Sequence, residues 1–95
     1  MKSTFLVVAY DVVSDRRRLR LSRYLATYGN RINLSVFECY VPVAEVPTFK
    51  TKAASFAHMS TDTVVFYALC LNCIASIERV GMGARQAAPS VVTTA

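Results

Sequence analysis

The stretch VVAYDVVSDRRRLR, residues 7–20, decides the fold, because a short apolar run ends at a carboxylate and is followed within a few positions by arginines. The apolar run extends back to residue 4 as TFLVVAY, which is rich in β-branched and aromatic residues. This composition predicts a central strand that is covered on both faces or buried at an interface and that ends at Asp11. Ser14 or Asp15 can cap a following helix, because their side chains accept hydrogen bonds from the free amides of a first turn.

We expect this helix to run to about Tyr28. Four apolar or aromatic side chains fall at positions i, i+3, i+4 and i+7 and should form one buried stripe: Leu21, Tyr24, Leu25 and Tyr28. Three arginines share a different side, which should face solvent: Arg16, Arg20 and Arg23. Gly29 is placed to close the helix in the left-handed conformation that glycine adopts most easily.

Four further segments with predicted structure follow in the sequence. Residues 31–43 hold β-branched residues in partial alternation, which predicts one bent strand or two short strands with a break that the pattern does not place. Residues 44–58 carry apolar side chains at helical spacing, with Pro47 in a position that a first helical turn tolerates. Residues 63–71 predict another buried strand, and residues 74–80 predict a shorter, amphipathic strand.

The order of these elements predicts an α+β fold, a ferredoxin-like β-α-β-β-α-β sandwich with an additional C-terminal strand. In such a sandwich the helices cover one face of the sheet, and the other face is left for a partner or a ligand. We assign residues 1–81 to one domain and residues 82–95 to a C-terminal tail, which we expect to be extended or partly disordered.

The composition indicates a second subunit. Hydrophobic residues make up 54% of the 95 residues, more than a small domain can easily bury, and large apolar patches usually mark an interface. We therefore expect a homodimer. The longest apolar runs are far shorter than the roughly 20 residues that a membrane-spanning helix needs, and the N-terminus lacks the apolar core of a signal peptide. These features predict a cytoplasmic protein with no membrane partner.

The charge distribution indicates a polyanionic partner. The formal net charge is +5, and the eleven basic residues comprise eight arginines and three lysines. Six of the arginines lie within sixteen positions, from Arg16 to Arg31, and arginine suits bidentate contact with phosphates. The alternative is that these arginines only solvate an exposed helix face.

Asp11 is the candidate for chemistry, because a carboxylate at a strand end is held by rigid backbone and remains open to solvent. One carboxylate holds magnesium poorly, since that ion normally uses one or two carboxylates together with phosphate oxygens. Two-fold symmetry could bring a second Asp11 to about 4 Å, where the repulsion of about 4 kcal/mol at an effective dielectric of 20 would favour a bound cation. The alternative is a turn cap formed with its own backbone. His58 is expected to be structural.

The three cysteines, Cys39, Cys70 and Cys73, argue against a disulfide framework and agree with a reducing compartment. Cys70 and Cys73 have the two-residue spacing of a zinc half-site or a redox pair. A tetrahedral zinc would need two more ligands, for which only Cys39 and His58 are available. We favour structural thiols, with metal or redox use as the alternative.

Several motifs at matching separations resemble the small CRISPR-associated endonuclease family of the spacer-acquisition (adaptation) complex, the "Cas two" family. They are YDV, SDRRRLRLSRYLATYGNRI, SVFEC, a later D-x-V-x-x-Y and a closing ERVG. The resemblance extends over residues 5–81. It implies a ferredoxin-like homodimer in which two first-strand aspartates face each other, bind a divalent metal and, in some members, cleave phosphodiester bonds of RNA or DNA.

The resemblance also implies roles for individual residues. Asp11 would be the metal ligand for Mg²⁺ or another divalent cation such as Mn²⁺, with Tyr10 beside it and Ser35 and Phe37 lining the catalytic site. Five arginines would contact phosphates: Arg16, Arg17, Arg18, Arg20 and Arg31. The chain departs from the family at Asn33, where glutamine is usual, and at Val65, where arginine is frequent.

In the same family the dimer lies between two dimers of the CRISPR integrase subunit and supports duplex protospacer DNA. Two functional hypotheses follow. The first is a metal-dependent endonuclease that acts as a CRISPR adaptation subunit. The second is a non-catalytic architectural dimer that binds duplex DNA and bridges integrase dimers. An unrelated ferredoxin-like RNA-binding protein or toxin-type nuclease is a third possibility.

Overall fold

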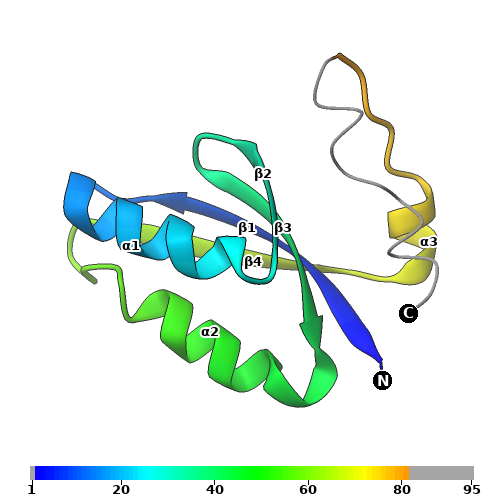
Figure 1. Cartoon of the computed structure of the whole chain (residues 1–95), viewed down its shortest axis with the longest axis horizontal. Helices are drawn as coiled ribbons and strands as arrows, with labels where there is room; N and C mark the ends of the chain where they lie inside the picture. Colours follow the sequence, from blue (N-terminus) through cyan, green and yellow to red (C-terminus); the bar gives the residue numbers. More distant parts are fainter. Residues whose placement is uncertain (1, 82–95) are drawn as a thin grey trace.

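The computed structural model describes residues 2–81 (Figure 1). The elements follow one another along the chain as β1 (Ser3–Asp11), α1 (Asp15–Ala26), β2 (Gly29–Asn33), β3 (Val36–Pro42), the short 3-10 helix η1 (Val43–Glu45), α2 (Val46–Ala54), β4 (Thr63–Leu69) and α3 (Leu71–Ala75). No helix within residues 2–81 is long and apolar enough to cross a membrane.

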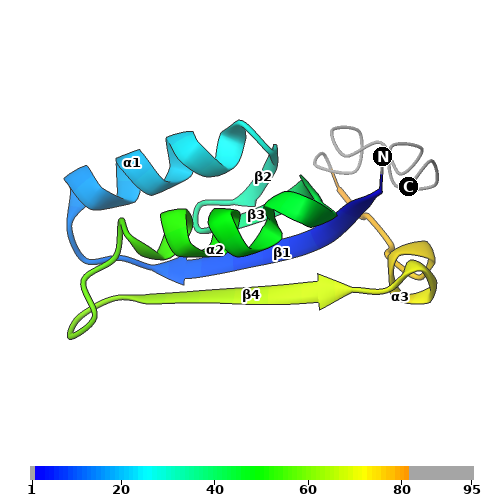
Figure 2. The same ribbon diagram turned by 90° about the horizontal axis from the view of Figure 1, so that it is seen from below.

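The four strands form one antiparallel sheet in the order β2-β3-β1-β4. Helices α1 and α2 lie on one side of this sheet, in front of β1 in Figure 1 and above β1 and β4 in Figure 2. The predicted ferredoxin-like β-α-β-β-α-β arrangement is therefore confirmed. The opposite side of the sheet, which we call the open face, carries no helix in this part of the chain.

Helix α1 forms as the sequence predicts. The side chain of Ser14 caps it by accepting a hydrogen bond from the Arg17 amide at 3.3 Å. Leu21 and Leu25 are fully buried, and Tyr24 packs beside them. These side chains contact the inward-facing residues of β1 and β3 and the centre of α2, and together they form the core: Leu6, Val8, Tyr10, Phe37, Cys39, Val41, Phe49 and Ala53.

Two predictions around α1 are corrected. The helix ends at Ala26 rather than near Tyr28, and Gly29 does not adopt the left-handed conformation but begins β2. Glycine is required there for a different reason, because a side chain at residue 29 would overlap the carbonyl oxygen of Glu38 on the neighbouring strand. The two strands approach so closely at this point that only glycine fits.

Residues 31–43 form two strands rather than one bent strand, and the break between them, which the sequence pattern did not locate, lies at Leu34 and Ser35. These residues contain the end of β2 and the whole of β3. The second predicted helix is shorter than expected, since α2 begins at Val46 after η1 and ends at Ala54. Pro47 occupies its first turn, as predicted.

The prediction of a strand over residues 74–80 is wrong for the described residues. Helix α3 follows β4 directly, and residues 76–81 form no regular element. The amide of Ile74 donates to the Cys70 carbonyl at 2.9 Å, so the chain turns away from the edge of β4 instead of pairing with it. The predicted tail, residues 82–95, lies outside the described residues.

Candidate metal and nucleic-acid site

Asp11 is the last residue of β1, and its side chain is exposed at the end of the open face. It lies opposite Thr63 of β4 in the sheet register. Successive residues of a strand point to opposite faces, so Asp11 shares its face with Ala9 and Val7, whereas Tyr10 points toward the helices. The rigid central strand therefore positions this carboxylate, as the sequence predicts.

The other predicted catalytic residues lie on the helix side or in the hairpin. Tyr10 is 4% exposed and Phe37 is 2% exposed, and their rings stack with centroids 6.4 Å apart. The Tyr10 hydroxyl donates to the Leu34 carbonyl at 3.2 Å, and its amide donates to the Ser35 carbonyl at 3.0 Å. Burial raises the pKa of Tyr10. Within one chain Tyr10 and Phe37 pack the end of the sheet on its helix side, so their side chains do not lie on the face that carries Asp11, and Ser35 holds the hairpin to β1 through its carbonyl.

The five predicted phosphate-binding arginines divide into two groups. The guanidinium groups of Arg17 and Arg18 are engaged by other groups of the same chain. Arg17 forms an ion pair with Asp62, and Arg18 forms one with Asp15 and donates to the Val12 carbonyl at 2.6 Å. The other three are exposed: Arg16, Arg20 and Arg31. Arg31 also lies over the Phe37 ring, 5.6 Å from its centroid. Arg23, on α1, is exposed as well, so the solvent-facing side predicted for this helix is present.

Asp62 holds together the loops at this end of the molecule, and sequence reasoning did not single it out for this role. Its Oδ1 accepts from the Val13 amide at 3.0 Å, and its Oδ2 accepts from the His58 amide at 2.7 Å. The Arg17 guanidinium donates to the same Oδ2 through Nε at 3.1 Å and Nη2 at 2.9 Å. The carboxylate thereby joins the loop before β4 to the loop after Asp11 and to α1.

These contacts lower the pKa of Asp62 well below its usual range, with the Val13 amide as the largest cause and the His58 amide and Arg17 adding to it. The signal available in the sequence was an aspartate in a polar turn directly before a strand. That pattern indicates a cap, but it does not identify Val13 or Arg17, which are more than forty residues away.

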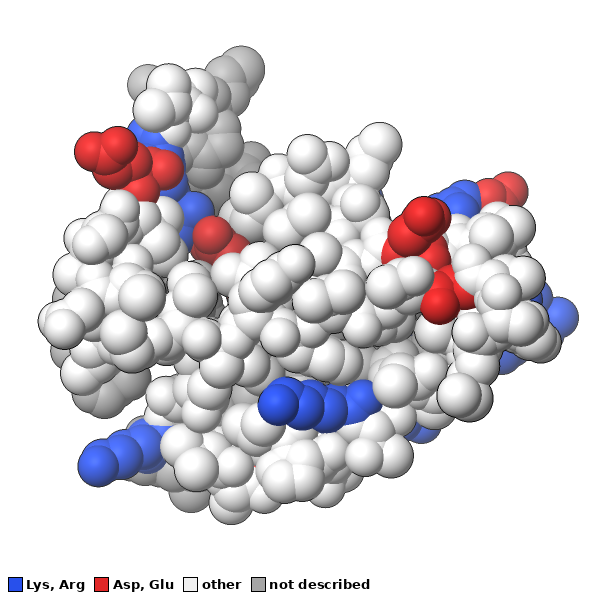
Figure 3. All heavy atoms as spheres, turned by 180° about the vertical axis from the view of Figure 1, so that it is seen from behind, with Lys and Arg blue, Asp and Glu red and all other residues white. Residues whose placement is uncertain are grey.

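The open face is largely apolar. Figure 3 shows the molecule from behind the view of Figure 1, and a broad uncharged area occupies the middle of this surface with charged side chains around it. Val7, Ala9 and Val65 are partly buried there, and Tyr67 is 53% exposed. One ion pair lies on this face, formed by Arg79 Nη2 and Glu38 Oε1 at 2.7 Å, and it attaches residues 76–81 to β3.

Within residues 2–81, one chain does not supply the donor set of a complete metal site. No group of three His, Cys, Asp or Glu side chains that could hold a metal occurs within residues 2–81. Asp11 offers an exposed oxygen donor of the kind that Mg²⁺ and Mn²⁺ prefer, and such ions are commonly held by one or two carboxylates with phosphate oxygens. The residues thus fit a cation that a second Asp11 or a nucleic-acid phosphate helps to bind.

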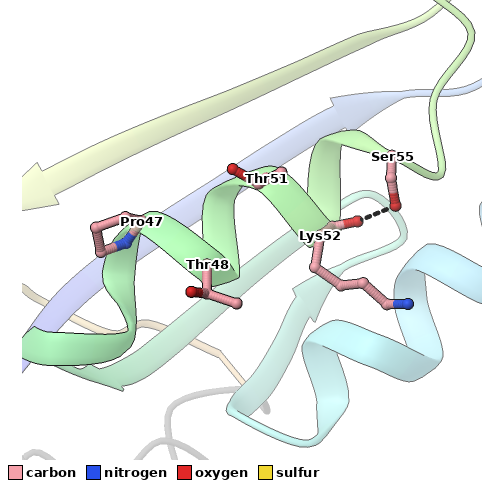
Figure 4. Close-up of a pocket in the computed structure, with 5 residues that line it drawn as sticks. All are labelled: Pro47, Thr48, Thr51, Lys52 and Ser55. Atoms are coloured by element: carbon pink, nitrogen blue, oxygen red, sulfur yellow. Dashed lines mark hydrogen bonds between the residues drawn. The ribbon is translucent and has the colours of Figure 1, made fainter.

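A shallow surface hollow follows α2 and is lined by Pro47, Thr48, Thr51, Lys52 and Ser55 (Figure 4). The Ser55 hydroxyl donates to the Lys52 carbonyl there, which closes the end of the helix. The hollow is in the helical layer, on the opposite side of the sheet from Asp11. It is therefore separate from the candidate site.

The fold and this site define a small ferredoxin-like α+β protein with an exposed carboxylate at the end of its central strand and a basic first helix. Residues 4–77 match the family model described as CRISPR associated protein Cas2. The chain belongs to this family. The resemblance inferred from the motifs is thereby confirmed.

Among similar proteins, the CRISPR-associated endoribonuclease Cas2 4 of Rhodospirillum rubrum is 33% identical over 78 residues, covering 82% of this chain but 61% of that relative. The crystal structure of Streptococcus pyogenes Cas2 at pH 6.5 superposes with a TM-score of 0.71 at 30% identity, covering 81% of this chain and 99% of the other. A chain of a partial Cas6-RT-Cas1–Cas2 complex superposes with a TM-score of 0.67 at 26% identity, covering 81% and 84%.

Proposed function

We propose that the chain is a nucleic-acid-binding subunit of CRISPR adaptation that acts, as a homodimer, as a metal-dependent endonuclease on RNA or DNA. The observation that carries this proposal is the position of Asp11, an exposed carboxylate at the end of an apolar sheet face and next to a basic helix. The name of the Rhodospirillum rubrum relative, an endoribonuclease, supports a nuclease activity.

The apolar open face supports the homodimer. A sheet face bearing Val7, Val65 and a half-exposed Tyr67 leaves apolar area that a second copy would cover. In a two-fold dimer each copy presents the same patch to the other. Because Asp11 is on this same face, an axis near the end of β1 would bring two Asp11 carboxylates together.

In this proposal the two Asp11 carboxylates hold one Mg²⁺ or Mn²⁺, which would polarise the phosphodiester and lower the pKa of an attacking water. The exposed Arg16 and Arg20 bind phosphates of the nucleic-acid strand. Arg17 has a positioning role, because it holds Asp62 and thereby the loop that follows Asp11.

The test is the Asp11→Asn variant, assayed on RNA, single-stranded DNA and duplex DNA with and without magnesium. We expect magnesium-dependent cleavage to be lost, while binding and dimerisation persist. Asp15→Asn is the matched control, because Asp15 is also an exposed carboxylate, with a side chain 94% exposed on α1. Cleavage that survives in Asp11→Asn, or is lost equally in both variants, would contradict the assignment.

A second function has its own support, namely an architectural dimer that bridges the integrase and binds duplex DNA without cleaving it. A similar chain forms part of a partial Cas6-RT-Cas1–Cas2 complex, and within residues 2–81 no group of three potential metal ligands accompanies Asp11. In this case Asp11→Asn would leave spacer acquisition unchanged.

Replacing Arg16, Arg20 and Arg23 by alanine should weaken DNA binding under both hypotheses, with the slope of log affinity against log salt falling by about one for each lost phosphate contact. Arg17 is excluded from this set because its loss would also disturb Asp62. An unchanged salt dependence in the triple variant would contradict both hypotheses.

A further inference from the structure

The turn after β4 brings two thiols together. Cys70 and Cys73 are both exposed, and their Sγ atoms lie 3.4 Å apart. The third cysteine of the chain, Cys39, is fully buried in the core. We propose that Cys70 and Cys73 are a redox-active dithiol that closes reversibly to an intramolecular disulfide by exchange with a small-molecule disulfide such as glutathione disulfide.

The geometry requires little movement to form this bond. Cys70 has extended backbone dihedrals, φ −77° and ψ 169°, and Cys73 lies three residues later in α3. The two sulfur atoms must approach from 3.4 Å to a bond length of about 2.05 Å, a change within the reach of side-chain rotation in a short exposed turn. Exposure of both thiols gives the small disulfide access to either sulfur.

The environment makes the two thiols unequal. A hydrogen bond from the Cys73 amide and the contact with the Cys73 thiol lower the pKa of Cys70, whereas the neighbouring Cys70 raises the pKa of Cys73. Cys70 is therefore the attacking thiolate and Cys73 the resolving thiol. Burial raises the pKa of Cys39 to about 12, which keeps that thiol out of the reaction.

The chemistry balances in two steps. The Cys70 thiolate attacks one sulfur of glutathione disulfide, forms a mixed disulfide and releases one glutathione thiolate, which takes up the proton that Cys70 gave up. Cys73 then loses its proton, attacks Cys70 Sγ and releases the second glutathione. The protein dithiol gives up two electrons and two protons, and glutathione disulfide is reduced to two glutathione molecules.

The position of the pair links it to the open face. The turn that contains Cys70 and Cys73 joins β4 to residues 76–81, which Arg79 attaches to Glu38 of β3. Closing the disulfide would fix this turn at one side of the surface that we assign to the second subunit. The redox site itself does not depend on the nuclease proposal.

The test uses the unmodified full chain. After equilibration in glutathione buffers and quenching by alkylation, trypsin releases residues 53–79, which hold Cys70 and Cys73, and residues 32–50, which hold Cys39. We expect the peptide of residues 53–79 to escape alkylation and lose about 2 Da, the mass of two hydrogens. Residues 32–50 should stay reduced throughout.

A dilution at fixed ratio distinguishes the disulfide from glutathione adducts. Closing the disulfide releases two glutathiones for each glutathione disulfide consumed. Tenfold dilution of the buffer at a constant ratio of the two forms should therefore raise the oxidised-to-reduced ratio of the protein about tenfold, whereas a mixed disulfide would not change. A Cys73→Ser variant should stop at the mixed disulfide on Cys70.

Three results would overturn the proposal. The first is a mixed disulfide in the unmodified chain that does not respond to dilution. The second is residues 53–79 of two chains linked to each other. The third is no oxidation of this peptide in buffers that oxidise a reference dithiol peptide of the sequence Cys-Leu-Asn-Cys.

Discussion

The two faces of the sheet differ in how much of their environment a single chain provides. On the helix side, Leu21, Leu25 and Phe49 are fully buried, and α1 and α2 complete the core. On the open face, Tyr67 remains 53% exposed beside partly buried valines, and within residues 2–81 the contact of Arg79 with Glu38 holds residues 76–81 to this face. The first face accounts for folding, and in the proposed function the second serves assembly and activity. Tyr10 and Asp11, neighbours in sequence, fall on opposite sides of this division.

The largest loss of stability should come from a substitution in the core on the helix side of the sheet. Phe49→Ala removes a fully buried aromatic ring that packs against Tyr24, Tyr28 and Phe66, so we expect a loss of about 3–5 kcal/mol in the free energy of unfolding. Chemical denaturation measures this loss. Lys50→Ala, at the exposed neighbouring position of α2, is the control, and an equal loss in both variants would contradict the packing described here.

A substitution on the open face should weaken dimerisation and leave the fold unchanged. Tyr67→Glu places a charge on the proposed interface, where like charges from two copies would meet, so the dissociation constant of the dimer should rise about a hundredfold. Sedimentation measures the dimer, and circular dichroism should show an unchanged fold. Ala26→Glu, on the exposed side of α1, is the matched control. A dimer unaffected by Tyr67→Glu would exclude this face as the interface.

Removing the ion pair on the open face should lower the free energy of unfolding by less than removing a core side chain does. Arg79→Ala leaves the Glu38 carboxylate without its partner in a site where both side chains are mostly covered, at 14% and 10% exposure. We expect a loss of about 1–3 kcal/mol in denaturation experiments. Adding Glu38→Gln should recover part of it, because the unpaired charge is then removed. No recovery in the double variant would show that the charge is not the cause.

The smallest effect should be the loss of stability of the unmodified chain in acid, which we expect to come from Asp62, the residue that ties α1 on the helix side to the loop after Asp11. Its pKa is lower in the folded chain than in the unfolded chain, so its contribution to stability is present above the ordinary value near 4 and is lost as the pH falls below it. Thermal unfolding at several pH values measures this loss. Asp62→Asn should be less stable at neutral pH and depend less on pH in acid, and an unchanged pH dependence would contradict the linkage.

The same division explains how much the sequence could predict. Ser14, Leu21 and Leu25 act through contacts within one helix or against apolar neighbours, so local patterns located α1 and its buried stripe. Gly29 could not be interpreted in this way, because the group that requires glycine is the Glu38 carbonyl on another strand. A glycine after a helix fits both a left-handed cap and a close approach of strands.

Long-range contacts limited the prediction of the site in the same way. The alternation of a strand already separates Tyr10 from Asp11, yet the sequence does not show that Asp62 binds Arg17, 45 residues away, or that Arg79 binds Glu38, 41 residues away. The alternation of apolar and polar side chains over residues 74–80 fits a strand, but a strand forms only where a neighbouring strand is available to pair with it. In this chain the turn at Cys70 leads residues 76–81 away from β4.

The central claim is that the open face joins two copies so that their Asp11 residues meet. The most direct measurement is disulfide cross-linking of an Asp11→Cys variant in which Cys70 and Cys73 are replaced by serine, beside an Asp15→Cys control in the same background. We predict rapid formation of a covalent dimer through residue 11 and none through residue 15. A chain that sediments as a monomer, or equal cross-linking at the two positions, would contradict the claim.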